Sequence, residues 1–94
     1  MRKDRTVISR LTGMLDMSVQ PLPGLPIVEL CADERVLIEN HNGVIGYGRE
    51  EICVAVNYGR IKVIGSKLKI CFMSKYQLVI VGQIGTIQIE RPQK

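Results

Sequence analysis

The side chains in this sequence whose types most often hold transition metals or act as nucleophiles are three cysteines and the single histidine. Cys31, Cys53 and Cys71 lie far apart in the chain. Structural zinc sites use close pairs such as Cys-x-x-Cys, and disulfide frameworks use an even number of cysteines. We therefore expect three reduced thiols that pack as small hydrophobic side chains, and no metal or other cofactor. Regulated oxidation and a Cys3His zinc site with His41 are the weaker alternatives.

His41 follows Glu39 and Asn40 and precedes an Asn-Gly pair. A histidine beside a carboxylate can act in acid–base catalysis, but the sequence offers no second histidine and no nucleophile with a neighbouring base. We expect the side chains of Asn40 and His41 to bond to turn backbone instead. A loop that contacts a partner is the second interpretation, which makes Glu39, Asn40 and His41 candidate partner-binding residues. The sequence therefore predicts no enzyme.

The positive charge is unevenly distributed over the 94 residues, whose net charge is +4. Between Ile52 and Ile89 every charged residue is basic, and the candidates for a basic stripe are Arg60, Lys62, Lys67 and Lys69. A solvated face that discourages edge-to-edge aggregation is the simplest explanation. The alternative is contact with an acidic protein, phospholipid headgroups or nucleic acid. Nucleic acid is the least favoured, because no aromatic stacking platform accompanies the lysines.

The pattern along the chain divides it into three parts. Residues 1–20 contain an expected amphipathic helix over 4–18, in which apolar residues recur at spacings of three and four: Val7, Ile8, Leu11, Met14 and Leu15. Residues 21–26 are rich in proline and predict an extended connector. Residues 27–91 predict a single β domain. A helix this short must dock or bind something to be ordered.

Short apolar alternations separated by turn residues predict a mainly β fold, an antiparallel meander that closes as a small barrel or sandwich. A short β-solenoid is the alternative topology. The expected strands are 27–32, 35–40, 44–48, 51–57, 60–65, 67–73, 76–81 and 84–90. The pair Asn42-Gly43 is the strongest local hairpin signal.

Two further turns set a register for the middle of the chain. A turn at Tyr58-Gly59 places Val54 opposite Val63, and a turn at Gly65-Ser66 places Lys62 opposite Lys69. Both turns give one apolar face, as the two-residue period of a strand requires. That face comprises Ile52, Val54, Val56, Ile61, Val63, Leu68, Ile70 and Phe72.

The segments 76–82 and 84–89 are apolar on both sides of the expected strand. Such strands are covered twice, either inside a closed fold or at a contact with another protein. Val79 and Val81 are therefore candidate partner-binding residues, and a homo-oligomer is possible. Leu11 to Gln20 is too short and too polar for a signal peptide or a membrane span, so we expect a cytoplasmic location.

The order of these segments resembles the YabP/YqfC family of bacterial sporulation proteins, and YqfC-type members most. The resemblance rests on Leu25-Pro26, on the run Ile38-Glu39-Asn40-His41 and on the later glycine-ended strands 59–65 and 78–82. Asn42 and the loop 71–75 depart from the family pattern. The resemblance implies a protein of an endospore-forming Firmicute that acts in the mother cell during formation of the spore envelope. It further implies no enzymatic activity, a YqfD-like membrane protein as partner and possible peripheral contact with the forespore membrane.

These features favour a non-catalytic assembly or adaptor protein that binds through its C-terminal strands and its N-terminal helix. A small basic β-barrel that binds nucleic acid is the alternative.

Overall fold

The computed structural model describes residues 24–92, which form six β-strands. The expected helix over 4–18 and the first part of the proline-rich connector lie outside the described residues. Within residues 24–92 there is no helix that could cross a membrane. The strands are β1 (Ile27–Cys31), β2 (Arg35–Glu39), β3 (Val44–Tyr47), β4 (Glu51–Val56), β5 (Gly59–Met73) and β6 (Gln77–Glu90).

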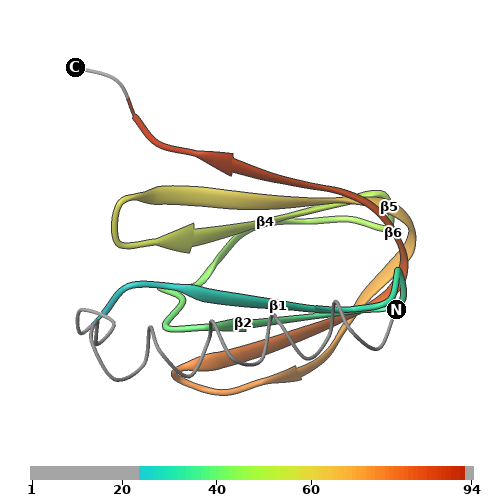
Figure 1. Ribbon diagram of the computed structural model, residues 1–94, viewed down its shortest axis with the longest axis horizontal. Coiled ribbons are helices and arrows are strands. Elements are labelled where there is room, and N and C mark those ends of the chain that lie inside the picture. The colour runs from blue at the N-terminus through green and yellow to red at the C-terminus, as the bar shows by residue number, and fades with distance from the viewer. Residues whose placement is uncertain (1–23, 93–94) are drawn as a thin grey trace, which may run out of the picture.

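All six strands belong to one antiparallel sheet in the order β1-β2-β6-β5-β4-β3. The sheet folds over on itself because its two longest strands, β5 and β6, bend together halfway along (Figure 1). We call β1, β2, residues 77–82 of β6 and residues 67–73 of β5 the first layer. The second layer comprises residues 84–90 of β6, residues 59–65 of β5, β4 and β3. The fold is thus a sandwich made from a single bent sheet.

Irregularities in the pairing of β5 with β6 produce the bend. The register shifts between Ile64 and Gly65 and again between Ser66 and Lys69, and Lys67 has a positive φ of 55°. Such bulges increase the local twist and bend a strand. Gly65 is required here because a Cβ at this position would collide with the carbonyl oxygen of Gln83. The β1–β2 turn fastens the outside of the bend, where the N–H groups of Gly82 and Ile84 donate to the carbonyls of Glu34 and Asp33.

The core lies between the two layers and is almost entirely aliphatic. Each layer contributes residues at alternate positions, as the pleat requires. Leu68 and Ile84 close the core at the bend, where they are 3% and 8% exposed. The other members of the cluster are Val36, Ile38, Ile52, Val54, Val56, Ile61, Val63, Leu78 and Ile80.

The expectation of a mainly β, antiparallel fold is confirmed. The expected meander is wrong, because β2 pairs with β6 and not with β3, and closure into a barrel is also wrong. Within the described residues, β1 and β3 are the two edges of the sheet and do not pair with each other. The solenoid alternative is also wrong, because every pairing is antiparallel.

Two of the predicted turns do not exist. Gly65-Ser66 lies inside β5, so the expected strands 60–65 and 67–73 are one strand and do not face each other. Asn42-Gly43 lies in the connection from β2 in the first layer to β3 in the second layer, which pair with different strands. Asn-Gly pairs favour hairpins because both residues tolerate unusual backbone angles. Here the same tolerance allows the chain to cross from the first layer to the second.

The predicted apolar face is largely confirmed despite a shifted register. Val54 pairs with Ile61 instead of Val63, so the β4–β5 hairpin is displaced by two residues, which keeps every side chain on its own face. Phe72 is the exception. A register shift between Ile70 and Phe72 turns the Phe72 side chain away from the core, and it is 50% exposed.

Candidate partner-binding surface

The outer face of the first layer carries a row of apolar side chains, which we call the outer patch: Leu37, Phe72, Val79 and Val81. Leu37 and Phe72 both lie opposite Val79, from β2 and β5 respectively. Val79 and Val81 alternate with the buried Leu78 and Ile80, so their side chains point away from the core. The outer patch therefore crosses three neighbouring strands at the middle of the layer.

Polar and charged residues surround the outer patch. Glu29 lies opposite Leu37, while Arg35 and Lys69 flank Val81 on either side. A depression at the β1 edge of this layer is lined by Glu29, Leu30, Cys31, Arg35, Leu37 and Val79. An apolar centre with a charged rim is the usual composition of a protein–protein contact.

Asn40 and His41 hold separate segments of the chain together. Asn40, which has a positive φ of 64°, donates from Nδ2 to the carbonyl of Leu25 at 2.8 Å. His41 is buried, and its Nδ1 accepts a hydrogen bond from the N–H of Gly43 at 3.0 Å. Since Nδ1 is the acceptor, Nε2 carries the proton and donates to the carbonyl of Ser74 at 2.9 Å. The predicted bonding to turn backbone is confirmed for His41, through Gly43, whereas Asn40 bonds to the backbone of the distant Leu25 instead.

Glu39 lies at the edge of this region, where its carboxylate accepts a hydrogen bond from Gln77 Nε2 at 3.2 Å. The carboxylate therefore does not bond to the His41 ring, both of whose nitrogens already have backbone partners. This geometry gives no support to acid–base chemistry by the pair.

The predicted basic stripe is wrong, because the bend in β5 separates its members. Lys62 lies opposite Cys53 and Gln88 in the second layer, whereas Lys69 lies opposite Val81 in the first layer. Lys67 and Lys69 are exposed.

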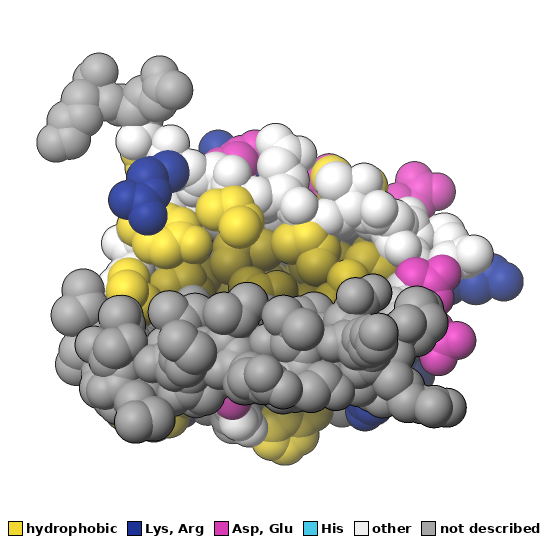
Figure 2. Space-filling model, viewed as in Figure 1, with side chains coloured by type: hydrophobic (Ala, Val, Ile, Leu, Met, Phe, Trp, Pro, Cys, Tyr) yellow, Lys and Arg dark blue, Asp and Glu magenta, His cyan; other side chains and the backbone are white. Residues whose placement is uncertain are grey.

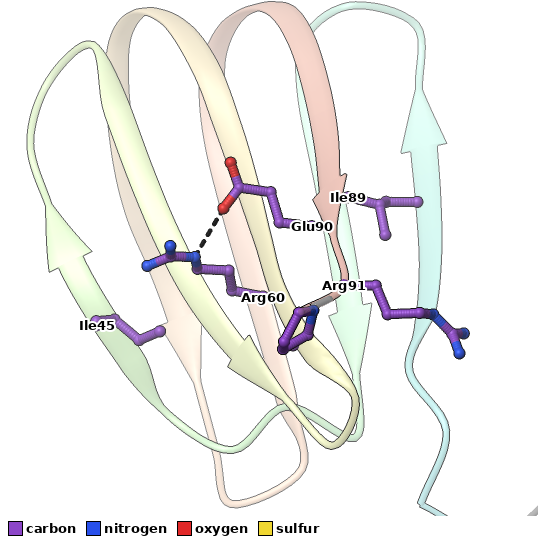
Figure 3. Close-up of a pocket in the computed structure, with 7 residues that line it drawn as sticks. Ile45, Arg60, Ile89, Glu90 and Arg91 are labelled. Atoms are coloured by element: carbon purple, nitrogen blue, oxygen red, sulfur yellow. Dashed lines mark hydrogen bonds and ion pairs between the residues drawn. The ribbon is translucent and has the colours of Figure 1, made fainter. Parts of the chain in front are cut away.

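Arg60 and Lys62 are engaged with carboxylates on the outer face of the second layer. Arg60 Nε is 2.7 Å from Glu90 Oε1 (Figure 3), and Lys62 Nζ is 3.5 Å from Glu90 Oε2 and 3.9 Å from Glu51 Oε2. Partial desolvation raises the pKa of Glu90, but the hydrogen bond from Arg60 and the charges of Lys62 and Arg60 outweigh it, so the pKa lies below its ordinary value. The cluster is a surface ion-pair network, which neutralises part of the positive charge.

The three thiols do not meet. Cys53 is buried in the second layer, while Cys31 and Cys71 are exposed on the first. Among residues 24–92 there is no group of three or more histidine, cysteine, aspartate or glutamate side chains that could hold a metal ion.

Of the predicted partner-binding residues, Val79, Val81 and Lys69 come together on the outer face of the first layer, and Glu39 lies on the same face two residues from Leu37. The remaining candidates lie elsewhere. The sequence interpretation missed Leu37 and placed Phe72 in the core. Leu37 gives the same signal as Val79, since it lies between the apolar residues Val36 and Ile38 and makes that strand apolar on both sides. Phe72 gave no usable signal, because its orientation depends on the bulge that precedes it.

A family model described as the YabP family matches residues 26–94, a range that contains all six strands. No curated protein and no solved structure matches the chain.

Proposed function

Because the chain belongs to the YabP family, whose members are associated with sporulation, we propose that it is a non-catalytic assembly or adaptor protein of spore-envelope formation. It would act in the mother cell, at or near the forespore membrane, as a YqfC-like member of the family. The outer patch would be its contact with a protein partner.

The observation that carries this proposal is the outer patch itself. Aliphatic side chains on an outer face cost free energy when they remain in water, about 25 cal/mol per Å² of apolar surface. Phe72 alone is half exposed, and the residues around it are only partly buried. Aromatic side chains at the centre of a contact contribute most to binding, so Phe72 is the expected anchor.

The partner we propose is a protein with an apolar surface and a mixed-charge rim, and a YqfD-like membrane protein is the specific candidate. The rim of the outer patch contains both signs, since Glu29 lies beside Leu37, and Arg35 and Lys69 lie on either side of Val81. A partner with complementary charges at its own edge would fix the register of the complex.

Nucleic-acid binding is the alternative, and the separation of Lys62 from Lys69 speaks against it. Binding through phosphates loses affinity steeply as salt rises. A salt titration with single-stranded and double-stranded DNA would detect it.

Capture of partners from sporulating cells with the full-length protein tests the proposal. The informative variant is Phe72→Ser, and the matched control is Tyr47→Ser, an aromatic residue of β3 that is 62% exposed in the other layer. We expect the wild type and Tyr47→Ser to capture the same membrane protein. We expect Phe72→Ser to capture at least ten times less of that protein than the wild type does. Equal capture by all three proteins would exclude the outer patch as the contact.

A further inference from the structure

A second apolar surface lies along an open seam between the two layers, on the opposite side of the first layer from the outer patch. Among the described strands, β1 pairs only with β2, and residues 84–90 of β6 pair only with β5. Figure 2 shows hydrophobic side chains in a continuous band along this side of the molecule.

The seam is lined by side chains that belong to the interior by register. Val28 and Leu30 of β1 lie opposite the core residues Ile38 and Val36, and Ile87 and Ile89 of β6 lie opposite Val63 and Ile61. Leu30 and Ile89 are nevertheless 55% and 59% exposed. Figure 3 shows Ile89 on the opposite side of β6 from Glu90, which faces outward. The core is therefore incomplete along this seam.

Segments of the two layers come close to each other at both ends of the seam. At the bend, the turn after β1 bonds to β6 through Asp33 and Glu34, as described above. At the far end, a Cβ placed on Gly24 would lie 3.6 Å from Asn57 Nδ2 in the second layer. The chain that precedes residue 24 therefore joins the domain at the mouth of the seam.

We propose that residues 4–18 of the same chain dock as an amphipathic helix in this seam. A helix of this length measures about 22 Å. The rim formed by residues 84–90 measures about 23 Å at the rise of a strand. The connector of residues 19–23 is long enough to turn the helix back along the seam.

The sequence of the segment matches the seam in pattern and in charge. Its apolar residues fall on one stripe and would replace water over Leu30 and Ile89, while the remaining residues are mostly polar. A helix that runs back from the mouth puts its N-terminal end at the bend. There the exposed carboxylates of Asp33 and Glu34 would meet the basic residues Arg2, Lys3 and Arg5.

Docking within one chain is favoured over docking onto a second copy because the segment is tethered at the seam. A short tether gives an effective concentration in the millimolar range. This inference does not depend on the proposed function, since the seam and the outer patch lie on opposite faces of the first layer.

Hydrogen–deuterium exchange of the full-length protein tests the inference. The variant is Ile89→Asp, and its matched control is Ile27→Asp, because Ile27 is 40% exposed and lies opposite Glu39 on the outer face of the first layer. We expect amides 7–18 to exchange at least ten times faster in Ile89→Asp than in the wild type, Ile27→Asp and Ile89→Leu. Amides of the core strands at Val54 and Ile61 report that each variant remains folded.

Three results would overturn the inference. The first is that amides 7–18 are unprotected in the wild type. The second is that these amides are protected equally in Ile89→Asp and in the wild type. Protection that rises with protein concentration, with a dimer detected by analytical ultracentrifugation, would assign the seam to a second copy.

Discussion

The strongest prediction from the structure concerns the replacement of His41 by phenylalanine. The His41 ring links the β2–β3 connection to the β5–β6 turn through hydrogen bonds with Gly43 and Ser74. Phenylalanine keeps the size of the ring but makes neither bond. A hydrogen bond within a protein contributes about 1 kcal/mol net. Gly43 is only partly buried and Ser74 is exposed, so water can bond to either backbone group when the ring is lost. We expect His41→Phe to lower the free energy of unfolding by about 1–2 kcal/mol.

Urea denaturation followed by circular dichroism measures this loss. In a domain of this size each kcal/mol lowers Tm by about 4–8 °C, so a thermal scan gives an independent check. Two amide variants separate the bonds. His41→Asn retains an acceptor for the N–H of Gly43, in the geometry of an Asx turn, and His41→Gln retains a donor for the carbonyl of Ser74. Each should lose about half as much stability as His41→Phe.

The reasoning would be refuted if His41→Phe changed the free energy of unfolding by less than about 0.5 kcal/mol, the range of ordinary surface substitutions. It would also fail if both amide variants lost as much as the phenylalanine variant, since size and not hydrogen bonding would then explain the effect.

Four further predictions follow from burial and charge. The lowered pKa of Glu90 means that its ion pairs stabilise the fold at pH values well above 4.5 and lose their effect as pH falls below that value, so the difference in urea midpoint between Glu90→Gln and the wild type should shrink in acid. Ile80→Ala should cost about 2–5 kcal/mol of unfolding free energy because Ile80 is fully buried, and Val79→Ala less than half as much in the same urea titration. Gly82→Ala should lower the thermal midpoint, because Gly82 has φ of 142° and an added Cβ would meet the backbone of Lys67; a midpoint within 2 °C of the wild type, on the scale of about 4–8 °C per kcal/mol, would count against this. A thiol reagent should modify two cysteines of the native protein rapidly and Cys53 only after unfolding, and rapid modification of all three would contradict the burial of Cys53.

Much of the β pattern could be predicted because apolar alternation is a local property. The expected strands 60–65 and 67–73 are one strand, β5, and 76–81 and 84–90 are one strand, β6. The remaining strand ends lie within a few residues of the expected ones. The inward-facing residues of β4 were predicted correctly although the predicted register was wrong. The register was displaced by two residues, which is the period of a strand and leaves each side chain on the same face.

The bend could not be predicted in the same way. Glycine inside a strand indicates either a turn or a close approach of two backbones, and Gly65 serves the second purpose. Because the turn was placed there, Lys62 and Lys69 were expected to face each other across a hairpin. Whether the chain turns or continues at Gly65 depends on a strand that is distant in the sequence, because both halves of β5 pair with β6.

The candidate site was predictable only in part. Val79 and Val81 stand out because their strand is apolar on both sides, and the register then adds Leu37 beside them. Phe72 joins them only through a one-residue irregularity, which no local pattern reveals.

The position of β6 in the sheet also has a consequence for how the chain matures on the ribosome. Without β6, the β1–β2 hairpin and the β3–β4–β5 meander share no hydrogen-bonded strand. During synthesis, the two parts therefore each expose one apolar face until β6 has left the ribosome and pairs with both of them. A premature stop before residue 77 would release a polypeptide without the strand that joins its two parts, and cellular proteases would be expected to degrade it.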